Sequence, residues 1–526
     1  MNDSRTISSW LKHGFDALAK GDLKKAEAFC KKVVQSNPRH PQGHFLIGLI
    51  ASEMNKKRIA ANALLHVTKL DPKHAGAWAH LAKIFSQIGY TVKADEAISK
   101  AADLNPQQAF IQSVIASVFS VIGEHENALH WCEKAVANDP DNEQYKTSLA
   151  NAYNFTGQQD LAQLAINDAL QITPDDPQAN WIRAGLSRQS SDDSAHEMIG
   201  MADKVAGNDH AQSFLYYGAG KVFEDVENWD AAFTAFEKGA AAKRKTLEFH
   251  EDIEEALFET LHKRFDHQWM SDDVAVSDQR GRPIFIVGQP RTGTTLIERI
   301  ITSHSKVKSA GELQQFYLSM RRLSKIQTPA RVNSELLLEA AKIEPGVLGK
   351  AYLHATRAHH EDGHYFVDKL PTNYLYVPLI ARALPHAKII HVKRGAADSC
   401  FSSFKQLFAQ AYPHSYDLEE MARHHVRYRK LMEHWRGVVG ERMLDVSYEE
   451  TVHDLEPNAR RLIDFLGLDW EPACLDFHKQ SGAVSTASAA QVRQPAHTRS
   501  VGRWKRYETQ LEPVINILDQ AGLMNS

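Results

Sequence analysis

The chain has 526 residues, enough for two to four domains, and its four cysteines lie far apart in the sequence. Neither a disulfide framework nor a zinc site is therefore expected. With 43% hydrophobic and 24% charged residues it has the composition of an ordinary soluble globular protein, and a net charge of −4 does not indicate binding to nucleic acid or to an anionic membrane. The first residues lack an apolar signal core, and no apolar run approaches the ~18 residues of a membrane span, so we expect a cytoplasmic protein.

The first part of the chain repeats itself every 34 residues. Proline, alanine and a turn-forming glycine or asparagine recur at this interval, and this period and pattern match the tetratricopeptide (TPR) repeat, which has two antiparallel helices per unit. The alanines let paired helices approach closely, glycine or asparagine turns the chain between them, and proline closes the second helix. The columns are Pro38, Pro72, Pro106, Pro140 and Pro174; Ala26, Ala60, Ala94, Ala128 and Ala162; and Gly21, Asn55, Gly89, Gly123 and Gly157.

The repeat register ends after Leu186, where the polar stretch 187–193 predicts a loop, and 209–243 predicts one more helix pair. We therefore expect an all-α TPR solenoid over 1–245, and a connecting amphipathic helix with a polar linker over 246–280. The concave face of such an array binds an extended peptide or a partner protein. The alternative is a scaffold that only stabilises the rest of the chain or brings two copies together as a homodimer.

From residue 281 onward, short apolar runs alternate with helical patterns. Strands are predicted at 284–287, 365–368, 388–392 and 443–446. This alternation predicts a three-layer α/β domain with a parallel sheet over 281–526. Ligands of such sheets bind at the carboxyl ends of the strands, so the residues that follow each strand are the candidates for a site.

The first of these strands leads into the loop GQPRTG, followed by Thr294, Thr295 and an apolar-periodic helix. A strand, a glycine-bearing loop and a helix N-terminus together form a cradle for an anion. The nucleotide-triphosphate loop G-x-x-x-x-G-K-[ST] requires lysine where this chain has Thr294, and its fixed charge lies earlier, at Arg291. The loop therefore suits one phosphate joined to another leaving group better than ATP or GTP. A plain surface turn is the alternative.

The segment PRTGTT resembles the phosphate loop of the sulfotransferases, most closely the tyrosylprotein branch, and the resemblance covers roughly the second half of the chain. It implies a P-loop-like α/β fold, the sulfuryl donor 3′-phosphoadenosine 5′-phosphosulfate (PAPS), its product PAP and no metal. By this resemblance the loop binds the donor, with Arg291 also acting in catalysis. The loop residues concerned are Arg291, Thr292, Gly293, Thr294 and Thr295.

The later strand ends extend the resemblance. Lys369 follows the second predicted strand, where the family has a lysine that stabilises the transferring group; by itself it could equally be a surface residue. Arg394 follows the third, and Ser402 lies eight residues later, like the family's pair for the 3′-phosphate; an ordinary helix serine is the alternative. The helix arginine of the tyrosyl branch is Gln406 here. Tyr448, in V-x-Y-E after the fourth strand, corresponds to a tyrosine that contacts the nucleotide, or else only packs.

Near the C-terminus, the segment around Gln491–Val492 resembles the family's S-x-x-Q-V-x-x-P lid over PAPS. The resemblance implies that Ser488 both binds the donor and takes part in catalysis. Arg503, before a tryptophan, corresponds to a basic residue that binds the donor. A solvated basic tail is the alternative reading of this stretch.

Sulfuryl transfer to a hydroxyl needs a base, and Glu312 is the candidate. It lies 21 residues after Arg291, at the interval of the catalytic glutamate in the tyrosyl branch. A glutamate after glycine that merely starts a helix is the alternative, and His304 is the second candidate base. Two other classes of function stay open: a P-loop phosphotransferase, and a TPR adaptor with an inactive nucleotide-binding domain. The acceptor is a hydroxyl; the resemblance names peptidyl tyrosine, and carbohydrate, lipid or small phenols fit equally well.

Overall fold

The computed structural model describes residues 2–271, 281–326, 332–359, 365–408, 411–480, 482–484 and 491–524. The chain divides into two compact units, Met1–Ala152 and Tyr153–Ser526. Among the described residues, no helix has both the length and the apolar character needed to cross a bilayer.

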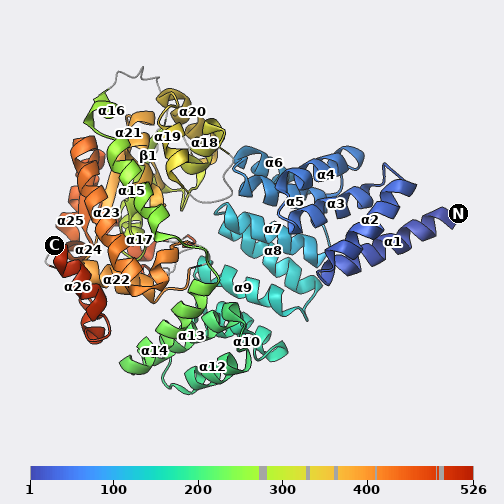
Figure 1. Cartoon of the computed structure of the whole chain (residues 1–526), viewed down its shortest axis with the longest axis horizontal. Coiled ribbons are helices and arrows are strands. Elements are labelled where there is room, and N and C mark those ends of the chain that lie inside the picture. Colours follow the sequence, from blue (N-terminus) through green and yellow to red (C-terminus); the bar gives the residue numbers. More distant parts are fainter. Residues whose placement is uncertain are drawn as a thin grey trace. The chain divides into compact units, whose positions relative to one another are not determined.

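The first unit consists of antiparallel helix pairs (Figure 1). Neighbouring pairs also pack on one another, α2 on α3 and α4 on α5, as in a solenoid. Its helices are α1 (Asn2–Ala19), α2 (Leu23–Ser36), α3 (Pro41–Glu53), α4 (Lys57–Leu70), α5 (Ala75–Gln87), α6 (Thr91–Asp103), α7 (Ala109–Val121), α8 (His125–Asn138) and the greater part of α9 (Glu143–Thr156).

The repeat columns have the roles that the sequence predicts. All the turn-column residues have positive φ, between 55° and 89°, the left-handed region that glycine and asparagine tolerate best. The alanines of the first four repeats are buried between helices, and each column proline lies two or three residues beyond the end of a second helix. Gly48 shows why small residues are needed, because a Cβ there would lie 2.7 Å from the Leu64 side chain. The TPR-like solenoid is thus confirmed.

The second unit begins with further helix pairs, including the pair predicted over 209–243, which is α13 and α14. The connecting amphipathic helix expected within 246–280 is followed by a separate short helix, and the polar linker beyond it lies mostly outside the described residues. These helices are α10 (Gln159–Ile172), α11 (Pro177–Leu186), α12 (Asp193–Lys204), α13 (Asp209–Asp225), α14 (Trp229–Lys245), α15 (Glu251–Arg264) and α16 (His267–Ser271).

A five-stranded, entirely parallel sheet follows, with the order β2-β3-β1-β4-β5. Four of its strands were predicted, whereas the three-residue β2 was missed because only one of its residues is apolar. The strands are β1 (Arg282–Gly288), β2 (Val307–Ser309), β3 (Tyr365–Asp368), β4 (Lys388–Lys393) and β5 (Met443–Ser447).

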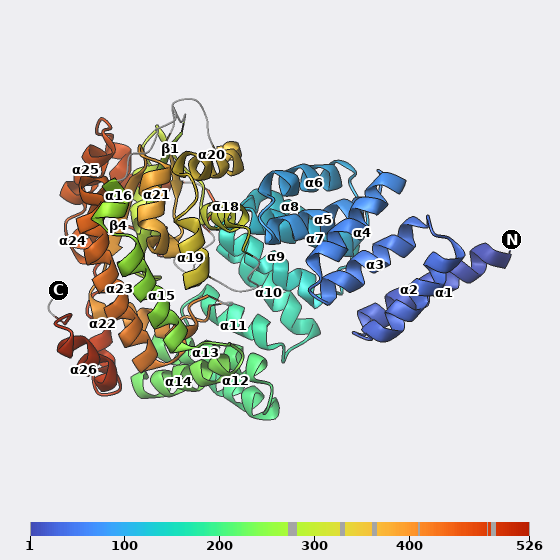
Figure 2. The ribbon, with the colours of Figure 1, turned by 45° about the horizontal axis from the view of Figure 1, so that its top comes forward.

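Helices cover both faces of the sheet and make the predicted three layers (Figure 2). Alternate residues of β1 point to opposite faces, with Phe285 and Val287 in one core and Ile284 and Ile286 in the other. The first face packs on α15 and on α18 (Gln315–Ser324), α19 (Ser334–Ala340), α20 (Pro345–Ala355), α21 (Val377–Ala383) and α23 (Leu418–Val439). The second face packs on α17 (Thr294–Thr302), α24 (Tyr448–His453) and α25 (Leu455–Leu466).

A third core joins the last helix pair to the α/β part of this unit. Side chains of α13 and α14 pack with those of α22 (Ala396–Phe404), the 3₁₀ helix η6 (Arg503–Tyr507) and α26 (Glu512–Gln520). The hydroxyl of buried Tyr217 on α13 donates a hydrogen bond to the Phe404 carbonyl at 2.8 Å. The α13–α14 pair is therefore built into the same core as the segment that follows β4.

Candidate active site

The loop after β1 requires glycine at both of its ends. A Cβ at Gly288 would lie 2.8 Å from the Val392 carbonyl oxygen, and one at Gly293 would lie 2.5 Å from the ring of Tyr448. Gly293 has φ +99° and directly precedes α17 without a side-chain cap, and the start of an uncapped helix is a favourable position for an anion. Thr292 closes the loop on itself by donating to the Gln289 carbonyl at 2.8 Å. This geometry fits the predicted anion cradle.

Each of five predicted site residues follows the carboxyl end of a different strand. Because the strands are parallel and adjacent, these residues meet along one edge of the sheet. In spatial order across the sheet they are Glu312 after β2, Lys369 after β3, Arg291 after β1, Arg394 after β4 and Tyr448, which begins α24 directly after β5.

On the β4–β5 side, the structure brings Arg394, Tyr448 and the loop together. Arg394 donates to the Arg291 carbonyl at 2.8 Å and to the carbonyl of Ser500 in the C-terminal segment, and its guanidinium carbon lies 5.0 Å from the Tyr448 ring centroid. Burial, with the charge of Arg394 nearby, lowers the pKa of Arg291 to about 10. A guanidinium remains cationic at neutral pH at that value, so two fixed positive charges lie at the loop.

The three other predicted donor contacts are less direct. Ser402 is partly exposed on α22, and the described part of the chain shows no hydrogen bond from its hydroxyl. Arg503 begins η6 and pairs with Glu224 at 3.1 Å. Ser488 lies outside the described residues. The segment after it is anchored in place, since Asp398 on α22 accepts from the backbone N–H groups of Gly502 and Trp504.

On the β2–β3 side, Glu312 and Lys369 form an ion pair, with 2.6 Å between Oε1 and Nζ. The strand pairing brings them together, because the Ala310 N–H donates to the Val367 carbonyl and the Lys369 N–H donates to the Gly311 carbonyl, each at 2.9 Å. Lys369 is buried, whereas 42% of the Glu312 side chain is exposed. A hydroxyl from solution can therefore reach this carboxylate.

Sequence reasoning missed a second carboxylate beside the lysine. Glu298 on α17 is buried, lies 3.9 Å from Lys369 Nζ and accepts a hydrogen bond from the Ser309 hydroxyl at 2.6 Å. Burial raises its pKa above the ordinary value, although Lys369 opposes this. A glutamate within the apolar run of α17 was the signal that could have identified it.

The second candidate base, His304, follows α17 and precedes the amino end of β2. Its Nε2 lies 2.9 Å from the Asp469 carbonyl oxygen, and its Nδ1 accepts from the Lys306 N–H at 3.1 Å. Both ring nitrogens are thus engaged at the sheet edge opposite to the carboxyl ends of the strands.

A cluster that could in principle hold a metal lies beside the loop. Glu254, His414 and His424 place ligand atoms within 4.8 Å of one another. However, the imidazole rings are stacked, with centroids 3.5 Å apart and 13° between planes. Their nitrogen lone pairs therefore lie in two nearly parallel planes and do not point at one common position, as metal ligands must. Arg427 also occupies the other Glu254 oxygen at 2.7 Å. These residues fit a hydrogen-bonded cluster better than a metal site, and His424 Nε2 supports the loop by contacting Gln289 at 3.1 Å.

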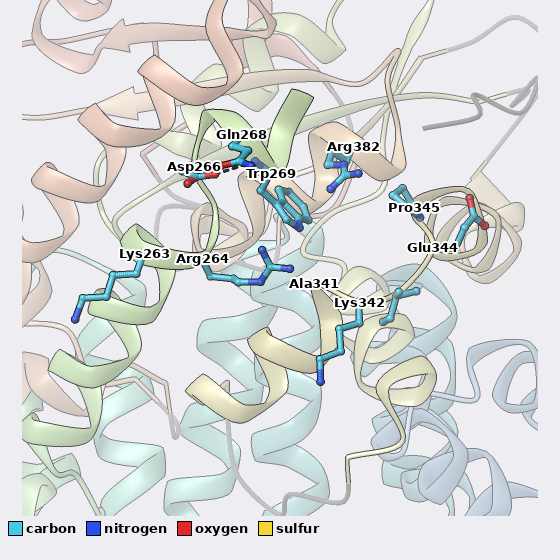
Figure 3. Close-up of a pocket in the computed structure, with 11 residues that line it drawn as sticks. Lys263, Arg264, Asp266, Gln268, Trp269, Ala341, Lys342, Glu344, Pro345 and Arg382 are labelled. Carbon is cyan, nitrogen blue, oxygen red and sulfur yellow. Dashed lines mark hydrogen bonds between the residues drawn. The ribbon is translucent and has the colours of Figure 1, made fainter. Parts of the chain in front are cut away.

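A cavity of about 490 Å³ lies elsewhere in the second unit (Figure 3). Arg264 and Arg382 flank the Trp269 ring there, with guanidinium carbons 6.0 Å and 4.2 Å from its centroid. The two acids of the lining bind backbone N–H groups, Asp266 that of Trp269 and Glu344 those at the start of α20. None of the predicted site residues lines this cavity, so it is separate from the strand-end site.

Comparisons with known proteins agree with this geometry. Residues 283–472 match the model of the sulfotransferase family. An uncharacterized protein of Aquifex aeolicus (strain VF5) is 32% identical over 311 residues, which are 57% of this chain and 40% of that protein. Protein-tyrosine sulfotransferase 1 of Danio rerio is 27% identical over 243 residues, 42% of this chain and 65% of that protein. The chain thus spans less than two thirds of either relative.

The helical part has solved structures of TPR proteins among its neighbours. A thermophilic TPR protein of Thermus thermophilus covers 34% of this chain and 98% of its own length, at 19% identity and a TM-score of 0.30. The TPR protein YrrB covers 40% of this chain and 91% of its own length, at 14% identity and a TM-score of 0.26. Residues 283–472 therefore form a domain of the sulfotransferase family, preceded in the chain by a TPR-like array of helices.

Proposed function

We propose that this chain transfers the sulfuryl group of PAPS to a hydroxyl group, with peptidyl tyrosine as the acceptor. The observation that carries the proposal is the order of side chains along the sheet edge. A reachable carboxylate paired with a buried lysine lies after β2 and β3, and a phosphate loop with two arginines lies after β1 and β4.

The β1, β4 and β5 ends suit the nucleotide. The loop offers N–H groups at the start of α17, and Arg291 and Arg394 add charge that a nucleotide with two phosphate groups requires. Tyr448 supplies an aromatic face beside them. Thr294 stands where the P-loop has its lysine, and this favours a donor without β- and γ-phosphates. Thr292, Gly293, Thr295, Ser402, Ser488 and Arg503 complete the proposed donor site.

The β2 and β3 ends suit the transfer step. Glu312 takes the proton of the acceptor hydroxyl while the hydroxyl oxygen forms a bond to the sulfur of PAPS. The bond between this sulfur and the oxygen that joins it to phosphorus breaks in the same step. The electron pair of that bond leaves with the phosphate of PAP. Lys369 and Arg291 stabilise this developing negative charge, and Ser488 assists them. Buried Glu298 keeps Lys369 from turning away when the Glu312 carboxylate gains its proton.

Peptidyl tyrosine is proposed because the tyrosine sulfotransferases of Danio rerio and Gallus gallus each align over 42% of this chain. We propose in addition that the TPR-like array binds a peptide or a protein partner, as solenoids with a concave surface commonly do.

Calorimetric titration of the full chain with PAP, ADP and ATP, with and without Mg²⁺, tests the donor. We expect tight binding of PAP that does not need Mg²⁺. Preference for ATP with Mg²⁺ would instead indicate a phosphotransferase, and no nucleotide binding would indicate an adaptor.

Transfer from ³⁵S-labelled PAPS to tyrosine peptides, carbohydrates, lipids and small phenols tests the acceptor. Labelled sulfotyrosine is the expected product. Label on another acceptor class alone would contradict the peptidyl-tyrosine assignment while leaving the donor assignment intact.

A further inference from the structure

Helix α13, from the last helix pair, places a buried carboxylate against the donor side of the sheet. Glu224 is 8% exposed and lies near the end of this helix. Both of its oxygens are 2.8 Å from Lys405 Nζ, Arg503 is 3.1 Å away, and the Tyr507 hydroxyl donates to it at 3.2 Å. A carboxylate from the helical array thus contacts Lys405, which directly follows α22, and two side chains of η6.

Two of these partners are cations, and one of them already belongs to the proposed donor site. Arg503 is one of the predicted donor-binding residues. Lys405 directly follows α22, three residues after Ser402 and one before Gln406, where the tyrosyl branch carries an arginine. Ser403, two residues before the lysine, donates to the Pro290 carbonyl at 3.3 Å, so this end of α22 lies against the loop, and the charge of Arg291 is one of the causes that lower the pKa of Lys405. The lysine is therefore in a position to replace the missing arginine, which the sequence pattern did not indicate.

Such a cluster of partly buried cations needs a counter-charge. Burial lowers the pKa of Lys405 to about 8, with Arg503 and Arg291 acting in the same direction and Glu224 opposing them. Burial acts to raise the pKa of Glu224, but Lys405 and Arg503 bring it below its ordinary value, so the carboxylate stays charged. The other acids nearby, Asp398 and Glu449, bind backbone N–H groups. Glu224 is the partner that keeps the lysine cationic.

We propose that Glu224 is a positioning residue of the donor site, holding Lys405 and Arg503 in place so that Lys405 binds a phosphate group of the nucleotide as a further cation. This inference rests on the proposed function. It makes the α13–α14 helix pair a structural part of the nucleotide site, in addition to any role of the helical array in binding a partner.

The test measures PAP affinity of the full chain by calorimetry at pH 7 and pH 9. The second pKa of a phosphate monoester is ~6, so both phosphate groups of PAP are already about nine-tenths dianionic at pH 7. A lysine with a lowered pKa is charged below that value and neutral above it. Wild-type affinity should therefore fall between pH 7 and pH 9. In Glu224→Gln the unpaired lysine loses its proton at lower pH, so PAP should bind about tenfold more weakly at pH 7, with little further loss at pH 9.

Three further variants separate positioning from simple loss of structure. Glu224→Gln combined with Lys405→Arg should recover most of the affinity at both pH values, because a guanidinium keeps its proton without the carboxylate. The matched control is Asp225→Asn, one residue further along α13, whose carboxylate contacts Lys221 and the Gln189 N–H instead. It should bind PAP like the wild type. Lys405→Arg alone keeps Glu224, and should abolish the change in affinity between pH 7 and pH 9.

Tighter PAP binding by Glu224→Gln would overturn the inference, because it would mean that the carboxylate only repels the anion. Unchanged PAP binding would overturn it too, because the carboxylate would then have no effect on the nucleotide. Persistence of the pH effect in Lys405→Arg would overturn it as well, and this result does not depend on whether Glu224→Gln folds. Failure of the wild type itself to bind PAP would instead contradict the proposed function.

Discussion

The cations on the two sides of the sheet edge have different hydrogen-bond partners. On the β2–β3 side, Lys369 lies between the carboxylates of Glu312 and Glu298. On the β1–β4 side, Arg394 donates to backbone carbonyls of the loop and of the C-terminal segment. The single charge of Lys369 is outweighed by its two carboxylates until one of them takes a proton, whereas Arg394, held by carbonyls, keeps its full charge for an anion. This difference supports the proposal that one side binds the anion and the other transfers the proton.

Removing the reachable carboxylate should have the largest effect. Glu312→Gln should lower kcat by about 10²–10⁴-fold, the usual contribution of a general base, while PAP affinity stays within a few-fold of the wild type. Transfer of ³⁵S from PAPS, together with PAP calorimetry, measures both quantities. Glu339→Gln, which removes an exposed carboxylate paired with Lys342, is the control. Normal turnover in Glu312→Gln would show that the base is another group.

On the anion side, replacing the guanidinium fork by a single ammonium should mainly change binding. Arg394→Lys keeps the charge but loses the second of its two directed hydrogen bonds, so PAP should bind about 10-fold more weakly. Calorimetry measures the loss, and circular dichroism checks the fold. Equal PAP affinity in this variant would mean that Arg394 serves the loop alone.

The pH dependence of stability tests the raised pKa of Glu298, which lies on the β2–β3 side. Its pKa is raised in the fold, so its contribution to stability is complete below the unfolded value near ~4.3 and is lost as the pH rises through the folded value. Glu298→Gln has no carboxyl group to ionise at this position, so it does not lose stability in this way as the pH rises. Its melting temperature relative to the wild type should therefore rise from pH 4 to pH 7. A constant difference across this range would contradict the raised pKa.

The smallest effect is expected at the opposite edge of the sheet. His304→Asn removes a ring that is bound to the Asp469 carbonyl, so it should lower the free energy of unfolding by about 1–3 kcal/mol. Turnover per folded molecule should stay within about twofold of the wild type, because the proposed proton acceptor Glu312 is untouched. Denaturant unfolding and the ³⁵S assay measure the two quantities separately. A selective loss of turnover would make His304 the base after all.

Local patterns predicted most of the fold. The 34-residue columns predicted the helix pairs because each small or turn residue acts on its own neighbours. Four strands were evident as apolar runs. The strand β2 was not, because it is short, edge-located and mostly polar, and its existence depends on pairing with β3.

The part of the site that was predicted consists of residues whose position relative to a strand can be read from the sequence. Residues that directly follow a strand, such as Lys369 and Arg394, can be found by position alone, since parallel strands present their carboxyl ends together. Glu298 and Lys405 could not, because they lie within or just after helices. Glu224 was still less accessible, since 181 residues separate it from Lys405.

The sequence by itself determined most of the segments that become helices and strands, the repeat of the solenoid, and a glycine-bearing loop without the P-loop lysine between a strand and a helix. These properties follow from backbone preferences and apolar periodicity over a few residues. Only the tertiary structure decided which charges face one another: Lys369 with two carboxylates, and Lys405 and Arg503 with Glu224. Ion pairing depends on distance and burial in three dimensions, and spacing along the chain does not specify either.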